Sequence, residues 1–344
     1  MKRVTKIVLI LFCTCIAAGA ILAGTAYYYL FTPQFHPNET VYIYIDRDDT
    51  IDSVYHKIRE NGAPNNMKGF EWMAQYKQYA SRIRTGRYAI KPDEKAYHLY
   101  QRIAGGAQTP ARLTIGSVRT LDRLARNIGN QLMIDSAEIA TRLFDDAFIQ
   151  SIGYTKETLP SLFIPNTYEV YWTLSVDDLF ERMQNEHNKF WNKERTAKAA
   201  ALKLSPEEVS TLASIVDEET NAGAEKPTVA GLYLNRLRKG MMLQADPTVK
   251  FALQEFELRR ILFKHLETDS PYNTYKYGGL PPGPIRIPTI AGIDAVLNHE
   301  HHSYLYMTAK EDFSGRHNFA VTLSQHNANA RKYHEALNKR KIFE

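Results

Sequence analysis

The N-terminal apolar segment constrains this chain more than any other feature of its sequence. From Ile7 to Phe31 no residue is charged, and most side chains are those of Ile, Leu, Val, Ala or Gly. A helix needs roughly 20 apolar residues to cross the hydrocarbon core of a bilayer, and this segment is long enough to do so with some tilt. Tyr27, Tyr28 and Tyr29 near its end are typical of an interfacial aromatic belt. The segment is therefore predicted to be a transmembrane helix.

A cleaved signal peptide is the alternative for this segment, but it would have a shorter apolar core. Neither Cys13 nor Cys15 follows the small residue that a lipoprotein cleavage site requires. The basic residues before the segment favour a cytoplasmic N-terminus. We therefore expect residues 1–6 in the cytoplasm, residues 7–31 as an uncleaved single-pass anchor in the cytoplasmic (inner) membrane, and the rest of the chain in the periplasm or its equivalent.

The composition of the chain excludes several classes of protein. Of its 344 residues, 44% are apolar and 24% are charged, which is the balance of a globular protein and not of a disordered or polytopic membrane protein. The net charge of +5 comes without the clustered Lys and Arg of a nucleic-acid-binding surface. Both cysteines lie in the apolar segment, so a disulfide, a cysteine nucleophile and a cysteine-ligated metal are excluded beyond it.

The part that follows the anchor alternates between strand and helix patterns. After a linker at residues 32–40, strand patterns at residues 41–45 and 85–90 are each followed by a helix pattern. Residues 41–106 are therefore expected to form a small module built from a repeated strand–helix unit.

The rest of the sequence is mainly helical. Residues 107–174 form a connecting region, and residues 175–344 are expected to form a mainly helical domain with short strands near its end. The predicted fold class is α+β, with a single N-terminal transmembrane helix, a small module and a larger helical domain with short strands.

A strong helix start at Ser205 precedes an acidic cluster. Ser205 can cap the helix, Pro206 suits its first position, and Glu208 completes a capping box. The apolar residues that follow recur at spacings of three and four and predict one buried stripe. The stripe comprises Val209, Leu212, Ala213 and Val216. The next helix has an apolar set made of Val229, Leu232, Tyr233 and Leu237.

Three acidic residues, Asp217, Glu218 and Glu219, follow this stripe. At about 100° per residue, Glu218 points away from the stripe, Asp217 lies at its edge and Glu219 continues it. A carboxyl group beside apolar side chains is desolvated, which raises its pKa and lets it keep a proton near neutral pH, as a general acid must. Glu219 is therefore the candidate acid. The alternative is that all three residues form the solvated acidic end of a helix.

Later segments carry candidates for a sugar-binding cleft. Arg236 is either a surface cation or a clamp for a carboxylate or a sugar. Asp246, directly before Pro247, is either a cleft residue or an ordinary N-cap. The tyrosines of the segment YNTY at residues 272–275 either offer flat faces to sugar rings or pack in the core. The Gly- and Pro-rich run at residues 279–285 is too stiff for a phosphate-binding loop and suits a rigid cleft wall.

A metal site is not expected in this sequence. His299, His301 and His302 do not have the spacing of a zinc-binding HExxH helix and are typical of solvated histidines on a loop. His317 and His326 are candidates for the cleft.

These segments resemble, in order and rough spacing, those of the endolytic murein transglycosylase family, also called YceG-like. The matching segments are LASIVDEET (212–220), NRL (235–237), LQADPTV (243–249), YNTY (272–275), GLPPGPI (279–285) and the H-x-F and HN pairs at 317–319 and 326–327. The segment TGRYAI with the helix after it resembles the LysM-like module that these proteins carry behind a membrane anchor. Residues 41–106 are therefore expected to be LysM-like and residues 175–344 to be the catalytic domain.

The resemblance implies a lytic transglycosylase that cleaves MurNAc–GlcNAc bonds within peptidoglycan glycan strands and leaves 1,6-anhydro-MurNAc ends, without a cofactor. It also implies a role in terminating nascent strands beside cell-wall synthases. The catalytic glutamate of the family is the second acid of a Glu-x-Glu-Thr motif, which matches Glu219, whereas the first acid is Asp217 here. The chain departs from the family at Ile115-Gly116-Ser117, where Pro-Glu-Gly is expected, and at Ile287-Pro288-Thr289, where Asn-Pro-Gly is expected.

The candidate substrate-binding residues are Asp217, Asn235, Arg236, Gln244, Asp246, Tyr272, Asn273, Thr274, Tyr275, Leu280, Pro281, His317, Phe319 and His326. Two other functions remain open at this point. One is a muramidase that hydrolyses the glycan with water and pairs Glu219 with Asp217 or Asp246. The other is a membrane-anchored peptidoglycan-binding or assembly protein without catalytic activity.

Overall fold

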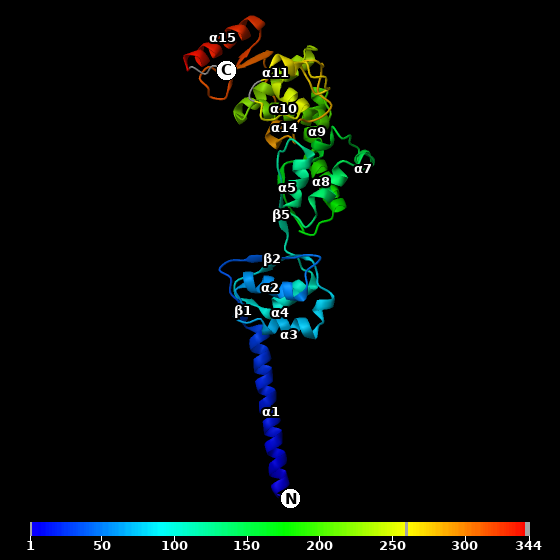
Figure 1. Cartoon of the computed structure of the whole chain (residues 1–344), viewed down its shortest axis with the longest axis vertical. Coiled ribbons are helices and arrows are strands. Elements are labelled where there is room, and N and C mark those ends of the chain that lie inside the picture. The colour runs from blue at the N-terminus through cyan, green and yellow to red at the C-terminus, as the bar shows by residue number, and fades with distance from the viewer. Residues whose placement is uncertain (1, 259–260, 341–344) are drawn as a thin grey trace. The chain divides into compact units, whose positions relative to one another are not determined.

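The computed structural model describes residues 2–258 and 261–340 (Figure 1). Its contacts divide the chain into two compact units. The first unit consists of Met1–Leu113 with the short segments Gln131–Met133 and Glu169–Leu174, and the second unit consists of the rest. The structure is helix-rich with short two-stranded sheets, as the α+β prediction requires.

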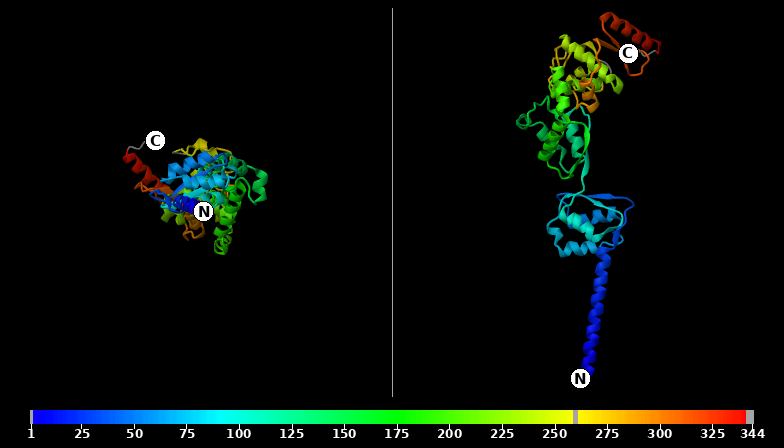
Figure 2. Two further views of the ribbon diagram at one scale, coloured as in Figure 1. Left: turned by 90° about the horizontal axis from the view of Figure 1, so that it is seen from below. Right: turned by 180° about the vertical axis from the view of Figure 1, so that it is seen from behind.

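The first unit begins with the apolar helix α1 (Lys2–Phe31). Among the described residues it is the only helix long and apolar enough to cross a membrane. Two side views show α1 as one straight helix that leads into a small body of strands and helices (Figures 1 and 2). The apolar side chains of α1 are exposed along most of its length, as expected for a helix whose surroundings are lipid.

The small body of the first unit has two antiparallel strand pairs. Strand β2 (Val41–Ile45) pairs with β3 (Gly86–Ile90), and β1 (Pro33–Phe35) pairs with β4 (Glu94–Lys95). The helices are α2 (Ile51–Gly62), α3 (Lys68–Tyr76) and α4 (Ala96–Gly105), with a 3₁₀ turn η1 (Tyr79–Ser81). Both predicted strands and both predicted helices are confirmed, whereas α3 was not expected. Part of the expected linker is structured, because Phe35 is fully buried in the core.

The second unit is mainly helical. Strands β5 (Ala111–Ile115) and β6 (Asn166–Val170) each have residues in both units. Before its central helix, the second unit contains α5 (Leu121–Gly129), α6 (Ser136–Leu143), α7 (Asp146–Ser151), η2 (Leu159–Leu162), α8 (Val176–Phe190) and α9 (Lys193–Leu202). After it come η3 (Gly223–Glu225), α11 (Lys226–Arg238), α12 (Asp246–Leu253), α13 (Phe263–Leu266), α14 (Ile290–Leu297), β7 (Tyr306–Ala309), β8 (His317–Ala320) and α15 (Leu323–Lys339). Strand β5 pairs with β6, and β7 pairs antiparallel with β8.

The central helix of the second unit is α10 (Pro206–Glu219). The predicted capping box is present, since Ser205 accepts from the backbone N–H of Glu208 and Glu208 accepts from that of Ser205. The predicted apolar stripe is fully buried. Neighbours α9, α11, α12 and α14 surround α10, so its C-terminal end is held inside the unit.

Candidate active site

The acidic end of α10 is not a solvated helix end. Asp217 is only 4% exposed, and its carboxylate accepts a hydrogen bond from Lys226 Nζ at 2.5 Å. The backbone N–H and the hydroxyl of Thr289 also donate to it, at 2.6 and 2.9 Å. Gly292 allows this approach, since a Cβ there would lie 2.6 Å from Asp217 Oδ1. Asp217 therefore joins α10 to the start of α14.

Glu218 is held by two arginines. Arg119 donates to both carboxylate oxygens, at 2.8 and 2.7 Å, and Arg286 donates to one at 2.9 Å. Burial alone would raise the pKa of Glu218, but the hydrogen bond from Arg119 and the charges of both arginines lower it below its ordinary value. Glu218 is therefore an ionised structural anchor and not an acid that holds a proton at neutral pH.

Glu219 differs from both neighbours because it has no cationic side chain bound to it among the described residues. It is half-buried, and the hydroxyl of Tyr233 donates to its Oε1 at 2.6 Å. Burial raises the pKa of the Glu219 carboxyl to about 7, and the negative charge of Asp246 adds to this rise. The hydrogen bond from Tyr233 and the electrostatic effects of nearby His317 and Arg236 oppose it. The direction of this pKa shift agrees with the one expected from the helical periodicity.

Glu219 lines a polar pocket of about 210 Å³ between α10, α11, the start of α12 and strands β7 and β8. The residues that line it are Glu219, Leu232, Tyr233, Arg236, Leu243, Gln244, Asp246, Tyr275, Met307, Thr308, Ala309 and His317. The structure therefore brings six of the sequence-predicted residues together around one cavity, although they come from distant parts of the chain. A polar cavity next to a carboxyl group that can hold its proton is suited to acid catalysis.

Two segments are joined at the wall of this pocket. The backbone N–H of Gln244 donates to Thr274 O, and that of Ala245 donates to Thr274 Oγ1, each at 3.0 Å. Tyr275 donates its hydroxyl to Asp246 Oδ1 at 2.5 Å. Asp246 is the first residue of α12 and Ala245 is its N-cap, so the N-cap interpretation of Asp246 is wrong. Thr274 itself is buried and acts as a brace behind the pocket.

Arg236 is not the surface cation that one interpretation expected. It is 8% exposed, and it donates to the backbone oxygens of Leu305 and Leu243, each at 2.6 Å. These bonds tie the residue directly before strand β7, and the loop before α12, to α11. Two nitrogens of Arg236 already donate hydrogen bonds to backbone oxygens. Arg236 therefore contributes positive charge to the pocket wall but is poorly placed to clamp a substrate carboxylate.

Two predicted asparagines lie behind the pocket wall and not on it. Asn235 donates to the backbone oxygens of His302 and Tyr304, at 2.7 and 3.2 Å. Asn273 is fully buried and donates to the backbone oxygens of Leu266 and Thr268, each at 2.8 Å. Their amide groups are occupied by loop backbone, so the structure gives both a supporting position.

Five further candidates also lie outside the residues that line the pocket. Leu280 and Phe319 pack against the core around α10, and Pro281 is buried. His326 bonds to Thr308 Oγ1 at 2.9 Å and so lies behind a pocket residue. The fifth, Tyr272, lines a different hollow.

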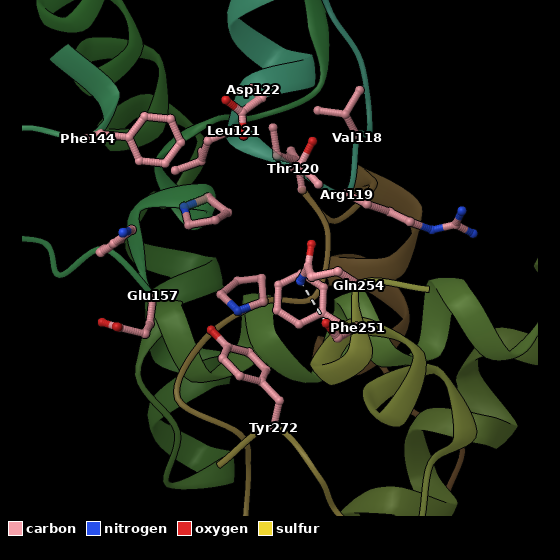
Figure 3. Close-up of a pocket in the computed structure, with 14 residues that line it drawn as sticks. Val118, Arg119, Thr120, Leu121, Asp122, Phe144, Glu157, Phe251, Gln254 and Tyr272 are labelled. Carbon is pink, nitrogen blue, oxygen red and sulfur yellow. Dashed lines mark hydrogen bonds between the residues drawn. The ribbon is translucent and has the colours of Figure 1, made fainter. Parts of the chain in front are cut away.

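That hollow has a volume of about 320 Å³ and is the larger of the two (Figure 3). Figure 3 shows Tyr272, Phe251 and Phe144 around it, with Arg119 at one side. Glu219 is not among the residues that line it. The smaller pocket is the better candidate for acid catalysis, because it contains the carboxyl group whose pKa is raised.

The histidines expected on a solvated loop are only partly solvated. His301 is exposed, but His299 is 8% exposed and His302 bonds to Thr228 O at 2.9 Å. Among residues 2–258 and 261–340, no group of three or more His, Cys, Asp or Glu side chains could hold a metal ion.

Sequence reasoning missed two residues of this site. Tyr233 was assigned to the apolar set of its helix, and its ring is indeed buried, but its hydroxyl reaches Glu219. Glu225, the last residue of η3, is 9% exposed, and its carboxylate accepts from the backbone N–H of His317 at 2.8 Å and bonds to His317 Nδ1 at 3.0 Å. Glu225 and His317 are far apart in sequence, so no local pattern could have linked them.

Asp217→Asn is expected to destabilise the fold by about 3 kcal/mol, because it leaves the buried ammonium group of Lys226 without its counter-charge. Chemical denaturation measures this loss. Asp269→Asn is the matched control, since Asp269 is 74% exposed in its pair with Lys276 and its replacement should cost far less stability. Equal losses for the two variants would show that the Asp217 pair does not stabilise the unit.

Comparison with known proteins places the chain in a family. Residues 43–332 match the model of the YceG-like family. The endolytic murein transglycosylase of Bacillus subtilis (strain 168) is 28% identical over 342 residues, which cover 94% of this chain and 93% of that protein. The endolytic murein transglycosylase of Streptococcus pneumoniae serotype 2 (strain D39) is 26% identical over 77% of this chain, which spans about half of that longer relative (53%).

A solved structure supports the same family. The crystal structure of a yceG-like protein from Listeria monocytogenes matches with a TM-score of 0.58 and 28% sequence identity, over 85% of this chain and 99% of that one. Because the family match covers most of the sequence, this chain belongs to the YceG-like family.

Proposed function

We propose that this protein is an endolytic lytic transglycosylase that cleaves MurNAc–GlcNAc bonds within peptidoglycan and leaves 1,6-anhydro-MurNAc ends. The observation that carries the proposal is Glu219, a half-buried carboxyl in a polar pocket whose pKa is raised to about 7. A large fraction of such a group still holds its proton at neutral pH, as a general acid requires. The names of the Bacillus and Streptococcus relatives, endolytic murein transglycosylase, support the same reaction.

Tyr233 decides which oxygen of Glu219 holds the proton. Burial raises the pKa of Tyr233 well above its ordinary value, so its hydroxyl stays protonated and donates to Glu219 Oε1. The acidic proton of Glu219 then resides on Oε2. Oε2 gives this proton to the glycosidic oxygen as the bond from C1 to that oxygen breaks.

The second step closes the anhydro ring. The ionised Oε2 of Glu219 takes the proton of the C6 hydroxyl of the same MurNAc as O6 bonds to C1. The acid is thereby restored, and no water is consumed. One carboxyl group is enough, whereas ordinary hydrolysis of a glycoside uses two. The internal hydroxyl also has a large proximity advantage over water.

His317 and Gln244 are proposed to bind the sugar next to this acid. An ionised carboxylate only accepts hydrogen bonds, so Nδ1–H of His317 donates to Glu225. This leaves Nε2 as the ring nitrogen free to bind a sugar group such as the 2-acetamido substituent. Gln244 contributes an exposed amide to the same pocket.

The other parts of the chain are proposed to place this pocket near nascent glycan. We propose that residues 1–6 are cytoplasmic and that residues 7–31 anchor the chain in the cytoplasmic membrane. Residues 32–40 link the anchor to a LysM-like module at residues 41–106. Residues 107–174 connect this module to the catalytic domain, which residues 175–344 form outside the membrane. The apolar helix α1 supports the anchor. An anchored enzyme of this kind would terminate strand elongation beside cell-wall synthases. Thiol labelling of single cysteines on each side of α1 in intact cells tests the orientation.

Digestion of purified sacculi tests the reaction itself. Mass spectrometry of the released fragments is expected to find anhydro-MurNAc ends, which are lighter by one water than the reducing ends of a hydrolase. A muramidase that pairs Glu219 with Asp246 is the second candidate, because both line the same pocket. Pairing with Asp217 is not supported, because Lys226 and Thr289 occupy that carboxylate. Binding of sacculi without any release would favour a non-catalytic peptidoglycan-binding protein.

Tyr233→Phe is expected to move the alkaline limb of the pH profile of kcat/KM upward by roughly one unit. The hydrogen bond from Tyr233 lowers the pKa of Glu219, so its loss raises that pKa above about 7 and keeps the acid protonated to higher pH. Activity falls as pH rises through this pKa, because the protonated form is the active one. Tyr272→Phe is the control, since that tyrosine lines the other hollow and should leave the limb in place. An unmoved limb in Tyr233→Phe would assign the limb to another group.

A further inference from the structure

The outer face of helix α3 carries aromatic residues that the fold does not bury. Trp72 is 43% exposed and Tyr76 is 79% exposed, whereas Phe70 and Ala74 on the other face lie in the core. Lys68, Trp72 and Tyr76 follow one another at a spacing of four residues, so they form one stripe along α3. We call this stripe the α3 face. Large exposed aromatic side chains in a row are typical of a contact surface.

The α3 face begins at the end of the apolar helix α1. The rings of Tyr29 and Trp72 meet edge to face with centroids 5.2 Å apart, and Lys68 Nζ lies 5.4 Å from the centre of the Tyr29 ring. Gly69 packs so closely on α1 that an added Cβ would lie 2.1 Å from Tyr29 O. Figure 1 shows α3 beside the end of α1. The direction of α3 relative to α1 is therefore set by packing within the first unit.

The length of α1 places Tyr29 at a membrane surface. A helix rises about 1.5 Å per residue, so Lys6 and Tyr29 are separated by roughly 35 Å along the axis. The hydrocarbon core of a bilayer is about 30 Å thick. If Lys6 lies at one headgroup layer, Tyr29 lies at the other, and Trp72 lies beside it.

We propose that the α3 face is a lipid-contact surface that rests on the outer headgroup layer of the phospholipid bilayer. Trp and Tyr concentrate at this depth because their rings are amphipathic. Lys68 and the neighbouring exposed Lys77 supply ammonium groups for lipid phosphates, while their stems can lie along apolar surface. The first unit is thereby held on the membrane at two places, α1 and α3. The inference rests on the proposed role of α1 as an anchor but not on the proposed chemistry.

Fluorescence of the full chain in phospholipid nanodiscs tests this contact. The protein has three tryptophans, of which Trp172 and Trp191 are 9% and 8% exposed and Trp72 is 43% exposed. The emission that is lost in the variant Trp72→Phe reports Trp72. Lipids brominated close to the headgroup are expected to quench this part of the emission by roughly half, and acrylamide in the water is expected to quench it weakly. The variant Trp172→Phe is the control and should keep the lipid quenching.

Three results would overturn the inference, and the first two also show whether α1 is an anchor. Strong acrylamide quenching of Trp72 without lipid quenching, in a chain that stays in the nanodisc, rejects the lipid contact but leaves the anchor. Release of the chain from the nanodisc rejects the anchor and with it the contact. Protection of Trp72 by added glycan strands, and not by lipid, would identify the α3 face as a polysaccharide surface. None of these results depends on the activity of Glu219.

Discussion

Glu219→Gln is expected to lower the release of anhydro-ended fragments from sacculi by at least about 10³-fold. The amide cannot donate the proton that the glycosidic oxygen needs, and it cannot take the proton of the C6 hydroxyl. It has nearly the same shape and can still accept the hydrogen bond from Tyr233, so the pocket should keep its structure. Mass spectrometry of digested sacculi measures the loss.

Glu335→Gln is the matched control for this variant, because Glu335 is exposed on α15 and does not line the pocket. It should digest sacculi at the rate of the unchanged protein. A Glu219→Gln protein that is folded and still forms anhydro ends would remove Glu219 from the mechanism.

The pH dependence of stability gives the same variant a second readout. The folded protein raises the pKa of Glu219 from 4.5 to about 7 and so binds its proton more tightly than the unfolded chain does. The resulting stabilisation is complete below about pH 4.5 and is lost as pH rises through 7. Glu219→Gln has no such loss, so at pH 8 it should be more stable than the unchanged protein by about 3 kcal/mol, and this gain should vanish near pH 4. Chemical denaturation at the two pH values measures it.

Glu225→Gln is expected to lower kcat on the order of 10²-fold. The carboxylate of Glu225 accepts two hydrogen bonds from His317, one from the backbone N–H and one from Nδ1–H. An amide has one acceptor oxygen, and its NH₂ group favours the tautomer in which Nδ1 accepts. The imidazole then presents a different protonation pattern to the sugar, although Glu225 itself does not line the pocket. Steady-state digestion kinetics measure the fall.

A comparison with His317→Asn shows whether Glu225 acts through the histidine. If it does, the double variant should be no slower than His317→Asn alone, because residues that act as a unit are not additive. Glu311→Gln is the control. Glu311 is bonded to Asn318, which is on the same strand as His317, but Glu311 does not line the pocket. Losses that multiply in the double variant would contradict a positioning role for Glu225.

Local features of this protein could be predicted from its sequence. The capping box at Ser205, the buried stripe of α10 and the half-buried position of Glu219 all follow from periodicity and cap chemistry, and the structure confirms them. The apolar helix α1 follows from composition alone. These predictions succeed because each depends on residues within a few helical turns of one another.

Partners from distant segments could not be predicted in this way. Periodicity indicates that Glu219 faces the interior, but not that Tyr233 on the next helix donates to it. It places Asp217 at the edge of a stripe, but not against Lys226. The predicted asparagines lie behind the pocket for the same reason, since only the packed loops reveal that their amide groups are already occupied.

The sequence by itself thus determined which carboxyl group could keep a proton, because desolvation at a helix face is a local property. Only the tertiary structure decided what surrounds that group, because a hydrogen bond between α10 and α11, or between η3 and β8, depends on how the chain packs. It also separated three consecutive acids into one buried ion pair, one arginine-bound anchor and one candidate proton donor. Neighbouring residues on a helix point in different directions, and each direction meets a different part of the chain.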